Sequence, residues 1–181
     1  MRRLKETEFD AFFELLSNSF PTDEYRPYAE QKALLQHPAY VVYTLWDAQG
    51  LLAAIACWEF EDICYAEHFA VRASARNRGV GGEMFRAFLE MYDHPVCLEV
   101  ELPTDDLTRR RIAFYERCGL YFHHFPYMQP PISHDKNPVP LRLMTNCKDI
   151  RPQTLLCIKR MLYRQVYRCR EDLYESENGY V

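Results

Sequence analysis

Apolar residues recur along this chain first at helical and then at strand spacing. The first stripe predicts an amphipathic helix that Thr7 caps and Pro21 ends, and a second short helix is expected before Pro38. The stripe consists of Phe9, Phe12, Phe13, Leu16 and Phe20. Three strand-like runs follow, at residues 40–46, 51–60 and 63–71. A turn ending in Gly50 joins the first two runs, so the pattern predicts two helices and then an antiparallel meander.

The second half of the pattern alternates strands with a further helix. Its predicted elements are a strand at 95–102, a helix at 105–118 that Gly119 stops, and strands at 121–125 and 139–144. Alternation in the first of these strands places Leu98 and Glu99 on opposite faces. The proline-rich segment 126–138 is interpreted as a loop, too polar and broken to be a strand. We therefore predict a single α/β (α+β) domain over residues 1–149, with a mixed, mostly antiparallel twisted sheet flanked by helices.

A separate amphipathic helix is expected at residues 150–170. Its apolar stripe is Leu155, Ile158, Leu162 and Val166. The basic residues between them, interpreted as a solvated face, are Lys159, Arg160, Arg164 and Arg168. We expect the extension 150–181 to pack on the domain or on a second copy of the chain, which would make a homodimer. Its acidic end, residues 171–181, is expected to fray.

Composition and charge exclude several classes of protein. The chain has 181 residues, 48% of them hydrophobic and 27% charged, as is usual for one globular domain. A net charge of −4 argues against a dedicated nucleic-acid binder, and the longest apolar run, 51–58, is too short to span a bilayer. The seven cysteines are odd in number and form no C-x-x-C pair, which predicts reduced thiols, a cytoplasmic location and no metal site.

One stretch carries a recognisable chemistry, because a glycine-rich turn lies between an apolar strand and an amphipathic helix. It consists of Arg76, Asn77, Arg78, Gly79, Val80, Gly81 and Gly82. The first N–H groups of a helix have no partner within the helix, and the helix dipole adds partial positive charge there. Glycine allows oxygen atoms of a ligand to approach the backbone. The stretch therefore predicts an anion site suited to phosphate.

The spacing Arg76-x-x-Gly79-x-Gly81 resembles the R/Q-x-x-G-x-G/A loop of the GNAT acetyltransferase superfamily. RIAFYERCGL resembles that family's second signature, a helix that carries a tyrosine, here Tyr115, and ends in glycine. Thr108 stands where that signature has an asparagine, so no role is carried over to that position. Together with EHFAV and RNRGVGG, these motifs are similar to a bacterial GNAT subgroup that is mostly uncharacterised.

The resemblance implies acetyl-CoA as co-substrate. Main-chain groups of Phe69, Ala70 and Val71 would pair with the pantetheine arm like an added strand, and the N–H groups of residues 76–82 would hold the pyrophosphate. Arg76 and Arg78 would neutralise phosphates or remain in solvent. The run 109–111, three arginines, is either a contact for the adenosine 3′-phosphate or helix-surface charge.

The reaction implied is transfer of an acetyl group to a primary amine by direct attack in a ternary complex. Tyr115 would donate a hydrogen bond to the leaving sulfur atom. The candidate bases are Glu99 and Glu67, each with a structural or substrate-binding role as the alternative, whereas His68 is expected on the face opposite Glu67. The acceptor is expected to be a small-molecule or peptide amine, cationic because acids gather near the expected site. The acids are Asp23, Glu24, Glu67, Glu99 and Glu101. A non-catalytic acyl-CoA sensor and a nucleotide-binding regulator are the competing hypotheses.

Overall fold

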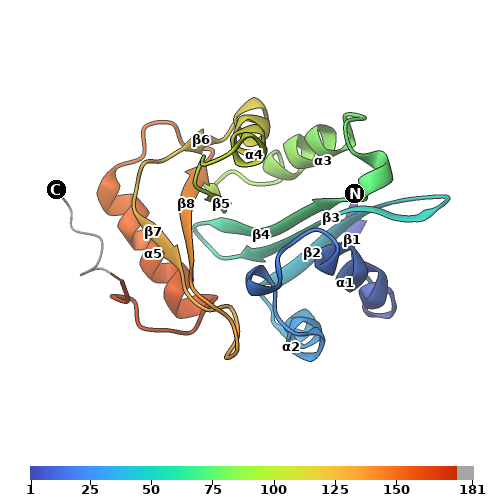
Figure 1. The fold of residues 1–181 in the computed structure, drawn as a ribbon, viewed down its shortest axis with the longest axis horizontal. Coiled ribbons are helices and arrows are strands. Elements are labelled where there is room, and N and C mark those ends of the chain that lie inside the picture. The colour runs from blue at the N-terminus through green and yellow to red at the C-terminus, as the bar shows by residue number, and fades with distance from the viewer. Residues whose placement is uncertain (175–181) are drawn as a thin grey trace. The chain divides into compact units, whose positions relative to one another are not determined.

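A computed structural model describes residues 1–174, which form two compact units, one over Met1–Leu98 and one that begins at Glu99. Over the described residues the strands are ordered β1-β2-β3-β4-β5-β8-β6, and β7 pairs with β8 (Figure 1). Strand pairs are mostly antiparallel, and β4 with β5 is a parallel pair. The predicted fold class, a mixed and mostly antiparallel sheet flanked by helices, is confirmed. The predicted division at residue 149 stays a prediction.

The first unit holds the helices and strands that lead into the glycine-rich turn. They are β1 (Arg2–Arg3), α1 (Phe9–Ser17), α2 (Tyr28–Ala33), β2 (Tyr40–Asp47), β3 (Gly50–Glu59), β4 (Cys64–Val71), α3 (Val80–Leu89) and the start of β5 (Val96–Glu101). In Figure 1, α1 lies against the meander, and its contacts are to β3 and β4. Phe9, Phe12 and Leu16 bury the apolar stripe of α1 at 1–2% exposure. Burial of each such side chain is worth about 1.5–3 kcal/mol.

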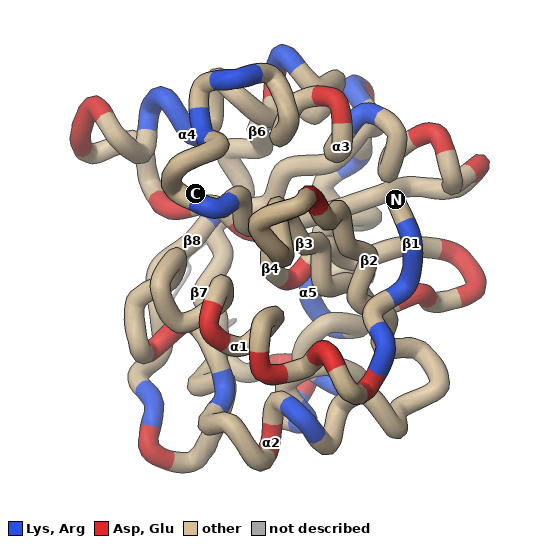
Figure 2. The backbone as a smooth tube through the Cα atoms, turned by 90° about the vertical axis from the view of Figure 1, so that its right-hand side faces the viewer, with Lys and Arg blue, Asp and Glu red and all other residues tan. Residues whose placement is uncertain are grey.

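Two details of the amino-terminal region differ from the sequence predictions. Thr7 does not cap α1, because it lies in a 3-10 turn, Glu6–Glu8, in which the Glu8 carboxylate accepts the Lys5 N–H at 3.0 Å. The helix also ends at Ser17, earlier than Pro21. The sequence did not locate β1, a two-residue strand, which Figure 2 shows in blue because both residues are arginines. Charged side chains on an edge strand disfavour pairing with another chain.

The second unit contains one strand that the sequence analysis assigned to a loop. Its elements are α4 (Asp106–Arg117), β6 (Tyr121–Phe122), β7 (Tyr127–Gln129), β8 (Val139–Thr145) and α5 (Pro152–Gln165). The loop assignment was wrong for β7, which pairs antiparallel with β8 through Tyr127↔Leu141 and Gln129↔Val139. Tyr127 and Gln129 are buried and Met128 is half-buried, which is strand alternation over three residues. Because prolines flank these three residues, the sequence pattern indicated a loop. Strand β6 is also shorter than the strand predicted at residues 121–125.

Helix α5 buries its apolar stripe within the chain. Leu155, Ile158, Leu162 and Val166 are each at most 7% exposed. Lys159, predicted to lie on a solvated face, is instead 1% exposed, with Nζ 5.2 Å from the centroid of the Tyr163 ring. A cation over an aromatic face is stabilised by the ring quadrupole, and this contact offsets part of the cost of burying the ammonium group. Of the end predicted to fray, residues 175–181 lie outside the part that the structure describes.

Two general features complete the fold. None of the helices within residues 1–174 combines the length and the apolar character needed to cross a membrane. All seven cysteines lie in this part of the chain and are free thiols, four of them buried.

Candidate functional site

The glycine-rich turn adopts the backbone that its sequence predicts. Asn77 and Gly79 have positive φ angles of 60° and 83°, and α3 begins directly afterwards at Val80. Gly79 is the N-cap residue, and its left-handed conformation is one that residues with a side chain rarely adopt. Residues 76–79 are exposed, so the turn is accessible from solvent.

The backbone N–H groups of this turn are available to a ligand. The N–H of Glu83 donates to the Gly79 carbonyl at 3.1 Å, which closes the first helical bond. Within the described residues, no backbone carbonyl accepts an N–H of residues 77–82. Unpaired N–H groups at the positive end of a helix dipole are the donors that bind phosphate oxygens. The turn therefore fits a pyrophosphate chemically.

The edge of β4 next to this turn is partly open. Pairing of β4 with β5 covers Cys64–Ala66, whereas β4 continues to Val71. The main chain of Phe69 and Ala70 thus extends past the residues that pair with β5, as the proposed pairing with pantetheine requires. The Val71 carbonyl accepts the Arg76 Nε–H at 3.0 Å, so a ligand would have to compete for that atom. The binding roles of Phe69, Ala70 and Val71 remain predictions.

A cavity of about 480 Å³ in the first unit borders the same turn. One face of α1 and the β2–β3 hairpin, including Trp46, line it together with Arg72 and Arg76. Arg72 contacts Asp47 at 2.5 Å, and Asp47 has its pKa lowered mainly by that hydrogen bond. Because Arg72 is already paired with an acid, the cavity offers less net positive charge than its two arginines suggest.

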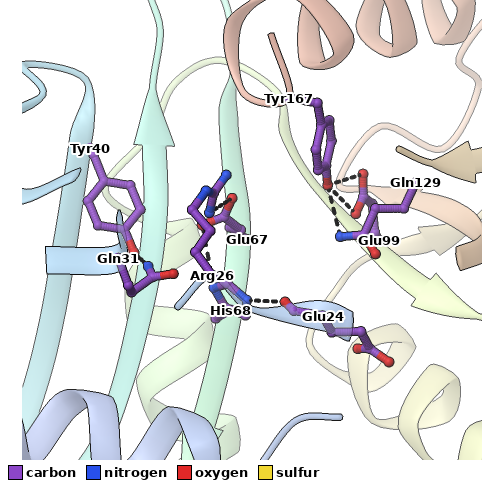
Figure 3. Close-up of polar contacts among 9 residues, drawn as sticks. All are labelled: Glu24, Arg26, Gln31, Tyr40, Glu67, His68, Glu99, Gln129 and Tyr167. Carbon is purple, nitrogen blue, oxygen red and sulfur yellow. Dashed lines mark hydrogen bonds and ion pairs between the residues drawn. The ribbon is translucent and has the colours of Figure 1, made fainter. Parts of the chain in front are cut away.

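A β-bulge in β4 determines where Glu67 lies. Ala56 pairs with His68 and Cys57 pairs with Ala66, so Glu67 is the extra residue that has no partner in β3. The bulge turns Glu67 and His68 toward each other, with 3.4 Å between Glu67 Oε2 and His68 Nδ1 (Figure 3). The expectation that His68 lies on the opposite face from Glu67 was therefore wrong, because strict alternation fails at a bulge. His68 Nε2 donates to the Glu24 carbonyl at 2.7 Å.

Glu67 is held as an anion by a buried arginine. Its side chain is 1% exposed and its Oε1 lies 2.9 Å from Arg26 Nη1, whose side chain is 7% exposed. Burial alone would raise the pKa of Glu67, but Arg26 and His68 outweigh it and lower that pKa to about 2. A carboxylate of this kind is a poor proton acceptor. The geometry therefore favours the structural role for Glu67 over the role of base, the two roles that the sequence left open.

Replacing Arg26 by Met should destabilise the fold by about 3–5 kcal/mol, because a buried carboxylate loses its partner. In the parent, the folded pKa of Glu67 is below its ordinary value of 4.5, so the stabilisation from its ion pair is present above about pH 4.5 and is lost as the pH falls toward about 2. In the variant, burial makes the neutral acid the preferred form. The difference in unfolding free energy between the two proteins should therefore shrink as the pH falls from 7 to 4.5.

Urea unfolding at both pH values measures this difference. Arg3→Met is the matched control, because the ion pair of Arg3 with Glu59 is exposed and is worth about 0–1 kcal/mol. The account is contradicted if Arg26→Met lowers the unfolding free energy no more than Arg3→Met does. It is also contradicted if the loss of unfolding free energy in Arg26→Met is the same at pH 7 and pH 4.5.

Glu99 is surrounded by hydroxyl donors in the second unit. Tyr127 on β7 donates to Glu99 Oε1, and the Tyr167 hydroxyl lies 2.8 Å from Oε2 and 3.0 Å from Oε1. Gln129 Nε2 donates to the Tyr167 hydroxyl at 3.1 Å (Figure 3). Burial is the main cause that raises the pKa of Tyr127 well above its ordinary value, and the charge of Glu99 raises it further. The Tyr127 phenol therefore keeps its proton and donates a hydrogen bond. The cluster thus stabilises an ionised carboxylate at residue 99.

Tyr115 lies on α4 as predicted, and is 9% exposed. Burial raises the pKa of its hydroxyl, the nearby Arg111 lowers it and Glu101 raises it, with a net upward shift. The phenol is therefore protonated throughout the physiological range and can act as a donor. Arg111 forms an ion pair with Glu101, and Arg109 pairs with Asp106 at 2.9 Å. These contacts favour the helix-surface role for these two arginines.

Sequence reasoning missed Tyr127, Gln129 and Tyr167. Two signals could have found them. Tyr163 and Tyr167 are four positions apart near the end of the helix predicted at 150–170, a spacing that puts aromatic rings on one side of a helical turn. Tyr127 and Gln129 alternate with Met128, which is strand spacing.

Comparison with known proteins identifies the family. A sequence model described as "Acetyltransferase (GNAT) family" matches residues 4–120, most of the chain. The chain belongs to this family. Its membership confirms the resemblance drawn from the two signatures and identifies an enzyme of the acyltransferase class.

Individual relatives agree with the family assignment. "Putative acetyltransferase YjbC" of Bacillus subtilis (strain 168) is 30% identical over 120 residues, 65% of this chain, and the chain spans 58% of that relative's length. A solved structure titled "Putative acetyltransferase from GNAT family" from Bacteroides thetaiotaomicron has a TM-score of 0.82 and 27% identity, covering 92% of this chain and 97% of that one. Ard1 from Thermoplasma volcanium, at 22% identity, shares the fold with a TM-score of 0.57 over 82% of this chain and 97% of its own.

Proposed function

We propose that this GNAT family member is an N-acetyltransferase that moves the acetyl group of acetyl-CoA to a primary amine by direct attack in a ternary complex. The observation that carries the proposal is the turn at residues 77–82, whose N–H groups have no backbone acceptor within the described residues and lie at the positive end of α3. The GNAT family generally uses acetyl-CoA, and a pyrophosphate is the anion that such a turn suits.

The proposed chemistry forms one amide bond and breaks one thioester bond. The neutral amine attacks the thioester carbonyl, the C–S bond breaks, and the sulfur leaves as the thiolate of CoA. The amine loses one proton in the process. The Tyr115 hydroxyl donates a hydrogen bond to the leaving sulfur, and Glu99 is the acid that attracts the acceptor and takes its proton, directly or through water.

The acceptor is proposed to be cationic before it loses its proton. Glu67 and Glu101 are engaged by Arg26 and Arg111, so this proposal rests chiefly on the ionised Glu99 carboxylate. A primary amine near pKa ~10 is an ammonium at neutral pH, and an anionic group both attracts and orients it. Small amines and peptides with a free amine both meet this description.

Release of CoA from acetyl-CoA in the presence of polyamines, peptides and aminoglycosides tests the proposal. We expect release with at least one cationic amine, with a rate that falls as salt is added because the attraction is screened. If acetyl-CoA binds but no amine in the screen promotes release, the non-catalytic acyl-CoA sensor becomes the better reading. If a neutral or acidic acceptor is best, the cationic acceptor is wrong.

A further inference from the structure

The carboxylate of Glu99 is held by residues that lie beyond the part of the chain that the family model matches. The family match ends at residue 120, whereas Tyr127, Gln129 and Tyr167 all follow it. Tyr127 and Gln129 belong to β7, and Tyr167 lies two residues beyond the end of α5. The region that the family model matches therefore supplies the acid, and the segment after it supplies the hydroxyl groups that donate to the acid.

We propose that this carboxy-terminal segment completes the catalytic site, with Tyr167 as a positioning residue that keeps Glu99 ionised and fixes the direction of its carboxylate. The inference rests on the proposed function, because it concerns the acid assigned there to the acceptor amine. It extends that function by assigning a role in the reaction to α5 and to the turn that follows it.

The geometry of Tyr167 makes it a directional donor. Its Oη lies at similar distances from both Glu99 oxygens, 2.8 and 3.0 Å, so it fixes the plane of the carboxylate as well as its position. Gln129 Nε2 donates to the same Oη at 3.1 Å, which leaves the hydroxyl hydrogen free to point at Glu99. Gln129 is 4% exposed and Tyr167 is 9% exposed, so water competes little for these bonds.

Tyr163 packs in the same aromatic cluster but donates its hydroxyl hydrogen to an acceptor other than Glu99. Its hydroxyl donates to the Met128 carbonyl, which ties α5 to β7. Its ring meets the rings of Tyr127 and Tyr167 edge to face, at centroid distances of 5.8 and 6.4 Å. Tyr163 is therefore a matched control for Tyr167, because both are buried tyrosines of one cluster and differ in the group that accepts their hydrogen.

The titratable groups of the Glu99 cluster allow a clear prediction for pH. Tyr127 from β7, Tyr163 from α5 and Tyr167 lie near Glu99, and Lys159, Cys169 and Tyr174 lie near Tyr163 in the same cluster. Of this set, only Lys159 is charged at neutral pH, since phenols and thiols are then protonated. Removing the Tyr167 hydroxyl takes away one donor to the charged form of Glu99, so the carboxylate should be protonated more readily.

The test compares Tyr167→Phe with Tyr163→Phe, and uses two measurements. The first is the pH dependence of kcat/KM for acetyl transfer to the amine found in the screen. The second is a ¹³C NMR titration of glutamate side-chain carboxyl groups, in which Glu99→Gln identifies the Glu99 resonance. For Tyr167→Phe we expect the acid limb of the profile and the Glu99 titration to move to higher pH by about one unit, the scale of one hydrogen bond to a charged group. Tyr163→Phe should move neither.

Each result decides the inference. Upward shifts in both measurements for Tyr167→Phe alone support it, and Gln129→Leu, which removes the donor to Tyr167, should give a smaller shift in the same direction. An unchanged Glu99 titration in a folded Tyr167→Phe protein overturns it, as does a titration that moves while the rate profile does not. If the parent transfers acetyl to no amine, the proposed function fails and the assigned role fails with it, and the titration reports separately whether Tyr167 holds the carboxylate.

Discussion

Replacing Tyr115 by Phe is expected to slow acetyl transfer by about 10²–10⁴-fold, the usual contribution of acid catalysis by one side chain, while acetyl-CoA affinity stays nearly unchanged. The substitution removes one oxygen and little volume, so packing around α4 should survive. A free phenol of pKa ~10 is already about 1.5 units too weak an acid to protonate a thiolate of pKa ~8.5 fully. Burial raises the pKa of Tyr115 further, so its hydroxyl would stabilise the thiolate by a hydrogen bond that it keeps.

The measurement is the single-turnover rate of Tyr115→Phe, with acetyl-CoA affinity from calorimetry. Tyr121→Phe is the control, because Tyr121 is 39% exposed in β6 and should tolerate the change. Because the pKa of Tyr115 is raised, this residue should stay protonated up to about pH 10. Any fall in the parent's rate with rising pH below that value should therefore come from another group. A Tyr115→Phe protein within about threefold of the parent, well below the expected range, would remove this residue from the mechanism.

Gly81→Glu is expected to abolish acetyl-CoA binding while the fold is retained. Gly81 lies in the first turn of α3, where the N–H groups would face phosphate oxygens, and the substitution adds both bulk and negative charge there. Gly81→Gln has nearly the same shape without the charge, so it separates crowding from repulsion. We expect weakened binding for the glutamine variant and none detectable for the glutamate variant by calorimetry. Parent-like affinity in a folded Gly81→Glu protein would place the phosphates elsewhere.

The conformation of the glycine-rich turn could be predicted from the sequence because it depends on local residues. Residues 76–82 need only a strand before them, a helix after them and glycine at the strained position, and the structure has Gly79 at a φ of 83°. The buried stripe of α5 was predictable for the same reason, since its period lies within one helix.

The environments of the two acids could not be predicted, because distant segments create them. A bulge places Glu67 beside His68, and Arg26, forty-one residues earlier, neutralises it. Tyr167 reaches Glu99 across sixty-eight residues, and the strand that carries Tyr127 is three residues long. The prediction that Lys159 faces solvent was wrong for a related reason. A basic residue in an amphipathic helix usually faces solvent, whereas Lys159 is buried against the Tyr163 ring.

The most direct test of the proposed reaction is a rapid-quench experiment with acetyl-labelled acetyl-CoA and the amine found in the screen. The proposed ternary-complex mechanism predicts that the acetylated amine appears in the first turnover together with an equal amount of CoA. It also predicts that mixing the protein with acetyl-CoA alone leaves the thioester intact and no label on the protein. Label that accumulates on a cysteine, or CoA released with no acetylated amine, would contradict direct transfer from acetyl-CoA to an amine.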